Sequence, residues 1–223
     1  MLYQISIWVI PVLLAITLHE AAHAWMAWRL GDDTAMRLGR VTMNPLKHID
    51  PFGTVLLPGL LLLSGMPAFG YAKPVPVLAH RLQEPKSDMV WVAAAGPGMN
   101  ILMAIGAALL LNFVAGEQTG ISGWLANVLL VMMYFNVFLA ALNMLPIPPL
   151  DGGRVVTGLL PDDLSRKFAQ IEPYGFFIII GLFMVPFLTR NLFGVDFSIL
   201  GMTLMPVVEY LYDVLDRAFI FVG

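Results

Sequence analysis

The segment ITLHEAAHAWMAWRL, residues 16–30, places two histidines and a glutamate inside a run that is otherwise strongly apolar. The whole run, residues 5–29, is long enough to cross the hydrocarbon core of a bilayer as a helix. An ionisable side chain at the centre of a bilayer costs roughly 3 kcal/mol or more. Groups retained at that cost usually serve a function, so this segment predicts a membrane helix that carries a functional site.

The composition supports a membrane protein. Of 223 residues, 59% are hydrophobic and only 12% are charged, and the mean hydropathy is +0.81. No polar stretch is long enough for a second folded unit, so we expect one domain over residues 1–223. The absence of cysteine excludes disulfides and thiolate metal sites. No basic cluster suggests a nucleic-acid partner.

Apolar runs predict the spanning helices. They cover residues 5–29, 89–114, 124–145, 174–189 and about 197–215. Residues 54–71 are also apolar, but two prolines and three glycines interrupt them, which suits a re-entrant segment. Short β-strands are expected near residues 36–43 and 71–77. The expected fold is therefore an all-α polytopic membrane protein with about five spanning helices, a re-entrant segment and a few short membrane-associated strands.

The sequence HEAAH, residues 19–23, fits the pattern H-E-x-x-H. Residues four apart lie on one face of a helix, so His19 and His23 can bind one metal ion together. Glu20 is placed not as a ligand but where it could take a proton from an attacking water. The alternative is that both histidines are structural and hydrogen-bonded inside the helix bundle. The cost of burying them in a membrane favours metal binding.

A zinc ion held by two histidines needs a third protein ligand and one open position. The candidates are His48, His80 and a carboxylate. Asp151, in NMLPIPPLDGGR, is the best of them because it directly follows a predicted span and precedes two glycines that allow a sharp turn. By itself, Asp-Gly-Gly is also an ordinary turn that ends a helix. The pairing with an intramembrane H-E-x-x-H motif favours Asp151 as a ligand.

Three motifs together resemble the site-2 protease family of intramembrane zinc metalloproteases. They are HEAAH, AGPGMN at residues 95–100 and NMLPIPPLDGG at residues 143–153, and the resemblance covers roughly residues 5–154. The segments GRVTMNPLKHIDPFG and GYAKPVPV resemble the compact prokaryotic branch that lacks PDZ and CBS domains. The C-terminal helices, residues 174–218, lie outside this resemblance.

The resemblance implies an activity and a set of roles. The expected reaction is hydrolysis of peptide bonds within or near transmembrane segments of substrate proteins, as in regulated intramembrane proteolysis. One Zn²⁺ ion per chain would be bound by His19, His23 and Asp151, with Glu20 as the general base. Asn143 matches a family asparagine that contacts the substrate or the developing oxyanion. Gly96, Pro97 and Asn100 would serve close helix packing, and an amide such as that of Asn136 is explained by interhelical hydrogen bonding.

Two other readings remain. A transporter or channel could use the same ionisable groups to line a pathway for metal ions or protons. It would be favoured by inverted repeats or a second acidic cluster, and the sequence shows neither. A non-catalytic homologue could bind transmembrane segments without cleaving them. The complete set of predicted ligands and base disfavours that reading.

The metal site also constrains topology. His19, His23 and Asp151 can meet at one depth only if the spans before them run in the same direction, which requires residues 54–71 not to cross the membrane. With the N-terminus outside, all of the twelve Lys and Arg residues except Arg190 then fall on the cytoplasmic side. We therefore expect a multi-pass protein of the cell inner or plasma membrane with its active site toward the cytoplasm.

Overall fold

The computed structural model describes residues 2–66, 70–114 and 119–221, and every regular element in these ranges is helical. The α-helices are α1 (Leu2–Arg29), α2 (Thr34–Arg37), α3 (Leu57–Leu63), α4 (Pro85–Leu111), α5 (Gly120–Asn143), α6 (Asp151–Leu159), α7 (Asp162–Ala169), α8 (Glu172–Phe193) and α9 (Ile199–Phe219). Single 3-10 turns lie at Pro45–Lys47 and Ala79–Arg81, and a π-helical turn at Pro51–Leu56 precedes α3. The expected all-helical fold is confirmed.

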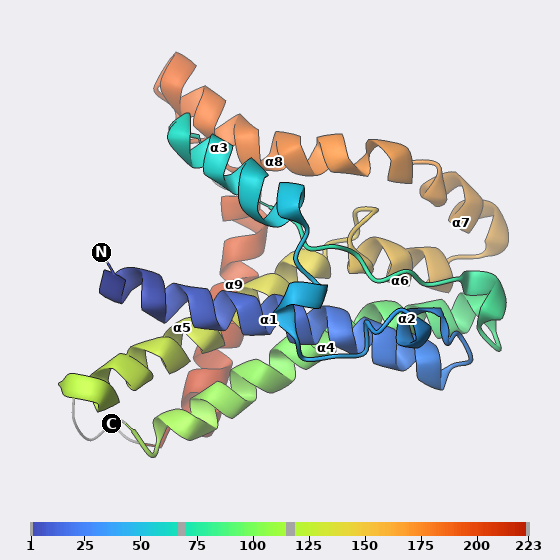
Figure 1. Ribbon diagram of the computed structural model, residues 1–223. Coiled ribbons are helices and arrows are strands. Elements are labelled where there is room, and N and C mark those ends of the chain that lie inside the picture. The colour runs from blue at the N-terminus through green and yellow to red at the C-terminus, as the bar shows by residue number, and fades with distance from the viewer. Residues whose placement is uncertain (1, 67–69, 115–118, 222–223) are drawn as a thin grey trace.

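The centre of the molecule is a bundle of α1, α4 and α5, in which α4 runs antiparallel to the other two (Figure 1). Small residues line the contacts between these helices. Ala15, Ala93, Ala104 and Ala108 are all at most 1% exposed. In a membrane, where lipid is as apolar as leucine, small side chains allow the close backbone approach that holds helices together. The bundle is therefore tight enough to bury polar groups from α1 between its neighbours.

Four helices in the described ranges are long and apolar enough to span a membrane: α1, α4, α5 and α8. The fifth expected span corresponds to α9, which does not qualify because its second half carries Glu209, Asp213, Asp216 and Arg217. Instead, α9 crosses behind α4 and α5 (Figure 1) and packs one apolar face, including Leu204, Val208 and Leu215, against them. Its last turn meets the end of α4, where Asn112 Nδ2 donates to Phe219 O at 2.6 Å. The expectation of about five spans is corrected to four.

The predicted β-strands are also corrected. Residues 36–43 begin inside α2 and continue as turns, and the described residues contain no strand there or at 71–77. Residues 71–78, called here the extended segment, do run extended, but their N–H groups donate to separate acceptors instead of one partner strand. Pro74 and Pro76 lack N–H groups, so a continuous ladder cannot form on this segment. The prolines of this segment indicated the extension correctly, whereas the prediction of strand pairing was wrong.

Hydrogen bonds join the two ends of the apolar segment between residues 51 and 71. Tyr71 N–H donates to Gly53 O at 3.1 Å, and Thr54 Oγ1 donates to Tyr71 O at 2.9 Å. Between these bonds lie the π-helical turn and α3; residues 67–69 of the predicted re-entrant segment lie outside the described residues.

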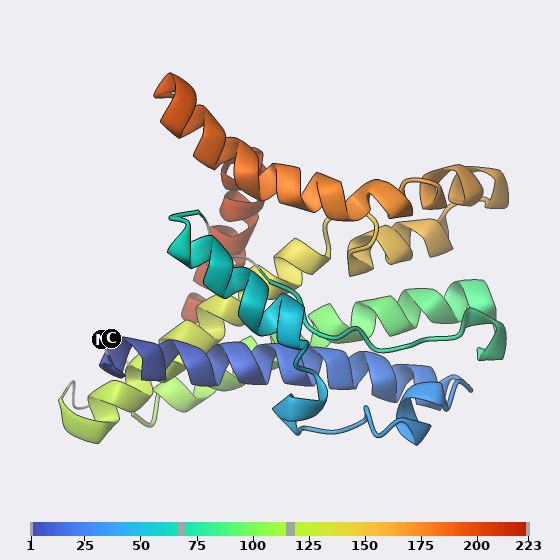
Figure 2. The same ribbon diagram turned by 45° about the horizontal axis from the view of Figure 1, so that its top comes forward.

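Both views show α8 standing apart from the α1–α4–α5 bundle (Figures 1 and 2). Its most apolar stretch buries none of its residues, unlike those of α1, α4 and α5.

Candidate active site

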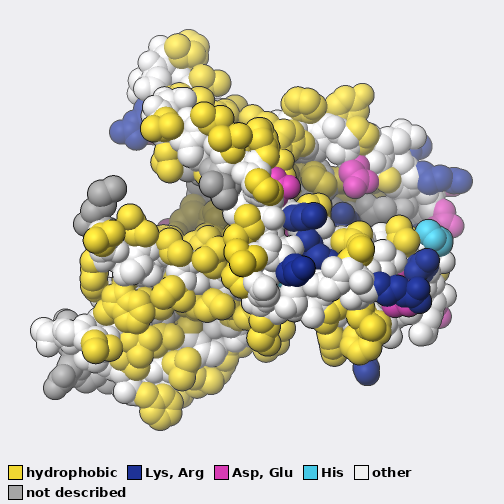
Figure 3. Space-filling view, in the orientation of Figure 1, with side chains coloured by type: hydrophobic (Ala, Val, Ile, Leu, Met, Phe, Trp, Pro, Cys, Tyr) yellow, Lys and Arg dark blue, Asp and Glu magenta, His cyan; other side chains and the backbone are white. Residues whose placement is uncertain are grey.

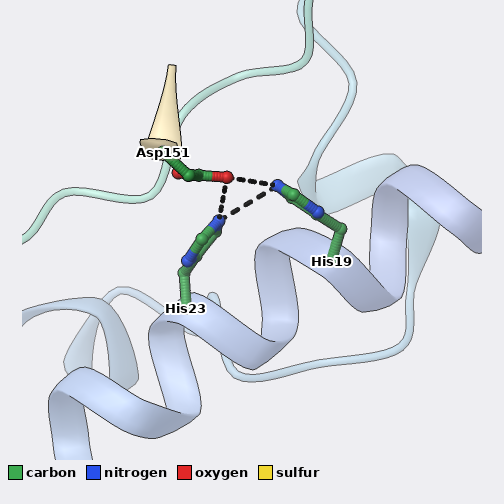
Figure 4. Close-up of side chains that lie close together, drawn as sticks. All are labelled: His19, His23 and Asp151. Atoms are coloured by element: carbon green, nitrogen blue, oxygen red, sulfur yellow. Dashed lines mark hydrogen bonds and ion pairs between the residues drawn. The ribbon is translucent and has the colours of Figure 1, made fainter. Parts of the chain in front are cut away.

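The side chains of His19, His23 and Asp151 are buried and converge beside α1 (Figure 4). The two histidines lie one turn apart on α1, and Asp151 is the first residue of α6. Their Nε2 atoms are 3.0 Å apart, and Asp151 Oδ2 lies 3.2 Å and 3.3 Å from them. A tetrahedral zinc site with bonds of 2.0–2.1 Å has ligand atoms about 3.3 Å apart. The three atoms therefore already have the spacing of three ligands of one zinc ion.

The other nitrogen of each imidazole fixes its protonation. His23 Nδ1 donates to the carbonyl of Val92 at 2.7 Å, and His19 Nδ1 donates to Asn100 Oδ1 at 2.6 Å. The Asn100 amide is itself oriented, because its Nδ2 donates to Asn136 Oδ1 at 2.7 Å. With Nδ1 carrying the proton, each Nε2 presents a lone pair toward Asp151. Such partners commonly fix the tautomer of metal-binding histidines.

Three electron-pair donors thus face one another at the site. Asp151 Oδ2 is buried and has no hydrogen-bond partner in the described residues. A buried acceptor without a donor is costly. A metal cation resolves this arrangement, and two imidazoles with one carboxylate are a donor set of catalytic zinc sites.

Three glycines make room for the site. A Cβ atom at Gly96 would lie 2.3 Å from His23 Nε2 and 2.7 Å from His19 Cε1. Gly152 and Gly153 lie inside α6, where a Cβ atom would meet Met144 O at 2.3 Å and Pro148 N at 2.5 Å. Neither has a positive φ. These two glycines therefore let the loop after α5 fold against α6, and the sharp turn expected of them is not their role.

Glu20 and Asn143 are not part of the cluster. Glu20 is half-buried, and its Oε2 accepts the backbone N–H of Val75 at 3.1 Å. Asn143 is the last residue of α5, where its Nδ2 donates to Leu139 O at 3.0 Å and makes no hydrogen bond to the cluster. Among the described residues, His48 and His80 belong to no group of potential metal ligands. The structure therefore favours Asp151 over both histidines as the third ligand.

A cavity of about 320 Å³ is lined by the extended segment, the turn before α6 and residues of α4, α6 and α7, whereas His19, His23 and Asp151 do not line it. One wall includes Val75 and Val77 of the extended segment, and the other includes Pro148 of the turn before α6 and Gly153 of α6 itself. The first wall touches Glu20 through Val75, and the second leads directly into Asp151. Two lining residues thus connect the cavity to the site: Val75, which bonds Glu20, and Gly153, which is two residues from Asp151.

The interhelical hydrogen bond expected of Asn136 is confirmed by its contact with Asn100, but the sequence did not reveal that Asn100 also bonds His19. Both asparagines are fully buried and form a chain of hydrogen bonds behind His19. The signal available was general: a metal-binding histidine needs a partner for its second nitrogen, and a polar side chain on a neighbouring span is the natural source. Gly96 was assigned to helix packing, whereas it clears space for both histidine rings.

Asn100→Ala is expected to weaken metal binding or activity by about 10- to 100-fold, because the His19 ring loses the acceptor that orients it. Titration of the purified variant with a competing chelator measures the loss. Asn127→Ala is the control, since this exposed amide on α5 bonds, among the described residues, Tyr3 Oη and Gly123 O. Equal metal affinity of Asn100→Ala and the native protein would contradict the assigned role of Asn100.

Comparison with known proteins agrees with this geometry. The family model described as "Peptidase family M50" matches residues 7–186. YwhC of Bacillus subtilis (strain 168), named as a candidate zinc metalloprotease, is 39% identical over 186 residues, which are 80% of each chain. Rip2 of Mycolicibacterium smegmatis, named likewise, is 30% identical over 81% of this chain and 68% of its own. Rip2 of Mycobacterium tuberculosis (strain H37Rv) is 31% identical over 82% and 68%.

No solved structure matches the chain with significance. The family match covers most of the sequence, the relatives align over most of their own length, and the buried His19–His23–Asp151 group suits the metal that they are named for. The chain therefore belongs to peptidase family M50, the site-2 protease family, and is an intramembrane zinc metalloprotease.

Proposed function

We propose that this protease, a single domain over residues 1–223, hydrolyses peptide bonds within or near transmembrane segments of substrate proteins. In this proposal His19, His23 and Asp151 bind the zinc ion and Glu20 is the general base. The observation that carries it is the convergence of three buried atoms of ligand type, His19 Nε2, His23 Nε2 and Asp151 Oδ2, at 3.0–3.3 Å from one another. Glu20, next to His19 in the chain, lies outside this triangle, and its Oε2 accepts the backbone N–H of Val75.

Each residue has a distinct task in the proposed reaction. When bound, zinc polarises a carbonyl and lowers the pKa of water. Glu20 accepts the proton of the attacking water and passes it to the leaving amine. Asn143 donates from its Nδ2 to the developing oxyanion, after releasing the carbonyl of Leu139. Its place at the end of α5, just before the loop that carries Asp151, supports this role.

The substrate must be extended where it is cut, because a helix hides its carbonyls in hydrogen bonds. We propose that it lies in the cavity between the extended segment and the turn before α6. Val77 lines this cavity, and its N–H and C=O have no partner among the described residues. These two groups can pair with a substrate backbone in the manner of β-augmentation. An unwound transmembrane peptide is the proposed partner.

The route from the lipid is suggested by the surface. Figure 3 shows a hollow between the part formed by α3 and α8 and the part formed by α1 and α5, with hydrophobic side chains on both sides. The exposure of the apolar residues of α8 fits a helix surrounded by lipid. We propose that a substrate helix enters through this hollow. The substrate helix would then stay in contact with lipid along its path to the cleavage site.

The proposed topology has the N-terminus outside and residues 54–71 re-entrant. It is supported by the hydrogen bonds that close both ends of that segment at Gly53 and Tyr71. Lys and Arg side chains gather at the end of the molecule where α1 ends (Figure 3), which the positive-inside rule assigns to the cytoplasm. Arg217, near the junction of α9 with Asn112, joins Arg190 as an exception. The metal cluster would then lie toward the cytoplasmic face.

Single cysteines test this topology, since the native chain has none. Ser87→Cys, at the start of α4, is expected to react with a membrane-impermeant maleimide only from the cytoplasmic side. Thr119→Cys, just before α5, is expected to react only from outside. Both positions are exposed in the structure. Labelling of the two cysteines from the same side would contradict the orientation.

The function itself is tested with the purified protein in liposomes. Mass spectrometry should detect two fragments of a synthetic transmembrane peptide, and removal of zinc should stop their formation. A transporter would instead carry metal ions or protons into the liposomes without cutting the peptide. A non-catalytic homologue would bind the peptide and leave it intact.

A further inference from the structure

The carboxylate of Glu20 is held by one backbone amide. Its Oε2 accepts from Val75 N–H at 3.1 Å, the only hydrogen bond that the described residues give this side chain. Val75 is 8% exposed and lies between Pro74 and Pro76. A following proline restricts the residue before it to extended conformations, so Lys73 and Val75 are both constrained. The position of the Glu20 carboxylate therefore depends on how firmly the Pro74–Val75 peptide group is held.

The same peptide group is bound from its other end by a buried arginine. Arg40 is 5% exposed, and its Nη2 donates to Lys73 O and, at 3.3 Å, to Pro74 O. Its Nη1 donates to Lys47 O. The carbonyl of Pro74 and the N–H of Val75 belong to one peptide bond and point in opposite directions. Arg40, this peptide group and Glu20 thus form a continuous chain of hydrogen bonds.

Arg40 differs from the arginines around it. Arg37 and Arg81 are exposed to a large extent and form ion pairs with Asp33. Arg40 forms no ion pair within the described ranges, although burying an unpaired charge is expensive. The hydrogen-bond partners of Arg40 are the carbonyls of Lys47, Lys73 and Pro74. The Pro74–Val75 peptide group connects Arg40 to the carboxylate of Glu20. A cation bound to the carbonyl also polarises the peptide group and makes its N–H a stronger donor.

Other bonds fix the segment on both sides of Val75. Lys73 N–H donates to His48 O at 2.9 Å, and Leu78 N–H donates to Asp32 Oδ2 at 2.6 Å. These bonds set the path of the chain. Arg40 is the group that binds the Pro74–Val75 peptide itself.

We infer that Arg40 is a positioning residue, which holds the general base Glu20 in place through the Pro74–Val75 peptide group. This inference rests on the proposed role of Glu20. A carboxylate displaced by about 1 Å can lower the rate of a reaction by about 100-fold. Loss of Arg40 should therefore lower kcat and leave zinc binding and substrate binding nearly unchanged.

The kinetic test uses Arg40→Gln, Val75→Pro and the double variant. Val75→Pro removes the N–H donor to Glu20, and Val75→Ala serves as its comparator because it shortens the side chain but retains the amide. Arg40→Gln and Val75→Pro, each alone, are expected to lower kcat on the order of 10- to 100-fold, with KM within about twofold and zinc content unchanged. The exposed Arg37→Gln is the matched control and should retain the native kcat.

The double variant separates positioning from general destabilisation. If Arg40 acts through this peptide group, Arg40→Gln should add little to the loss already caused by Val75→Pro, because coupled residues are not additive. Multiplication of the two losses would overturn the inference. So would a native kcat in Arg40→Gln, or a parallel loss of zinc, since Arg40 would then act on the metal site.

Hydrogen exchange gives a readout that does not need activity. Pro74 and Pro76 have no amide hydrogen, so in the extended segment Val75 is the only exchanging amide between Lys73 and Val77. Arg40→Gln and Glu20→Ala are both expected to speed exchange at Val75. If the native protein cleaves no peptide, the proposed function fails, and this experiment still decides whether Arg40 and Glu20 are linked. Unchanged exchange at Val75 in Arg40→Gln would overturn the link.

Discussion

Glu20→Gln is expected to bind one zinc ion per chain and to cleave a transmembrane peptide about 10²–10⁴-fold more slowly than the native protein. The amide cannot accept the proton of water, which removes general-base catalysis. Zinc should remain because Glu20 lies outside the His19–His23–Asp151 triangle and bonds Val75 instead. Elemental analysis and product formation, measured on the same preparation, check both halves of this prediction.

The control for this variant is Glu209→Gln, which changes an exposed carboxylate on α9 far along the chain. It should retain both zinc and activity. A native cleavage rate in Glu20→Gln would remove Glu20 from the mechanism. Loss of zinc in that variant would instead make Glu20 part of the metal site.

Asp151→Ala is expected to lose most of its zinc and, with it, the activity. The change removes one of three protein ligands and leaves two histidines on a single helix turn, so the loss of affinity should exceed the about 10- to 100-fold expected for Asn100→Ala. Competition with a chelator measures the affinity directly. Asp162→Ala, which removes an exposed carboxylate paired with Lys86, is the matched control. Full zinc occupancy in Asp151→Ala would exclude Asp151 from the ligand set.

The spanning helices could be predicted because a bilayer leaves few alternatives. A long apolar run must satisfy its backbone internally, and only a helix does so within one segment. The runs at 5–29, 89–114, 124–145 and 174–189 accordingly became α1, α4, α5 and α8. The fifth expected span, about residues 197–215, became α9, which is not among the helices apolar enough to span. The composition of such a run does not show in which direction its helix packs. The charged residues of α9 leave it one apolar face, and packing of that face against α4 and α5 sets its path.

The buried group that could hold a metal was predictable in part because the two histidines are close in sequence. His19 and His23 are four residues apart, and the chemistry of zinc together with the family resemblance pointed to Asp151. The supporting bonds could not be predicted from spacing. Asn100 meets His19 across 81 residues of sequence, and Val75 meets Glu20 across 55. The packing of α4 and the extended segment on α1 decides which amide or peptide group bonds His19 and Glu20.

The failed strand prediction has a similar cause. Pro74 and Pro76 correctly indicated extended backbone, but a strand also needs a partner with a complementary row of donors and acceptors. The extended segment has side chains and single carbonyls as partners instead. This arrangement leaves Val77 free to pair with another chain.

X-ray absorption at the zinc edge of the purified native protein tests the central claim most directly. The account predicts one zinc ion per chain with two imidazole nitrogens and carboxylate or water oxygens at about 2.0–2.1 Å, and loss of this signal in Asp151→Ala. A protein that cleaves its substrate without bound zinc, or a zinc environment without imidazole, would contradict it.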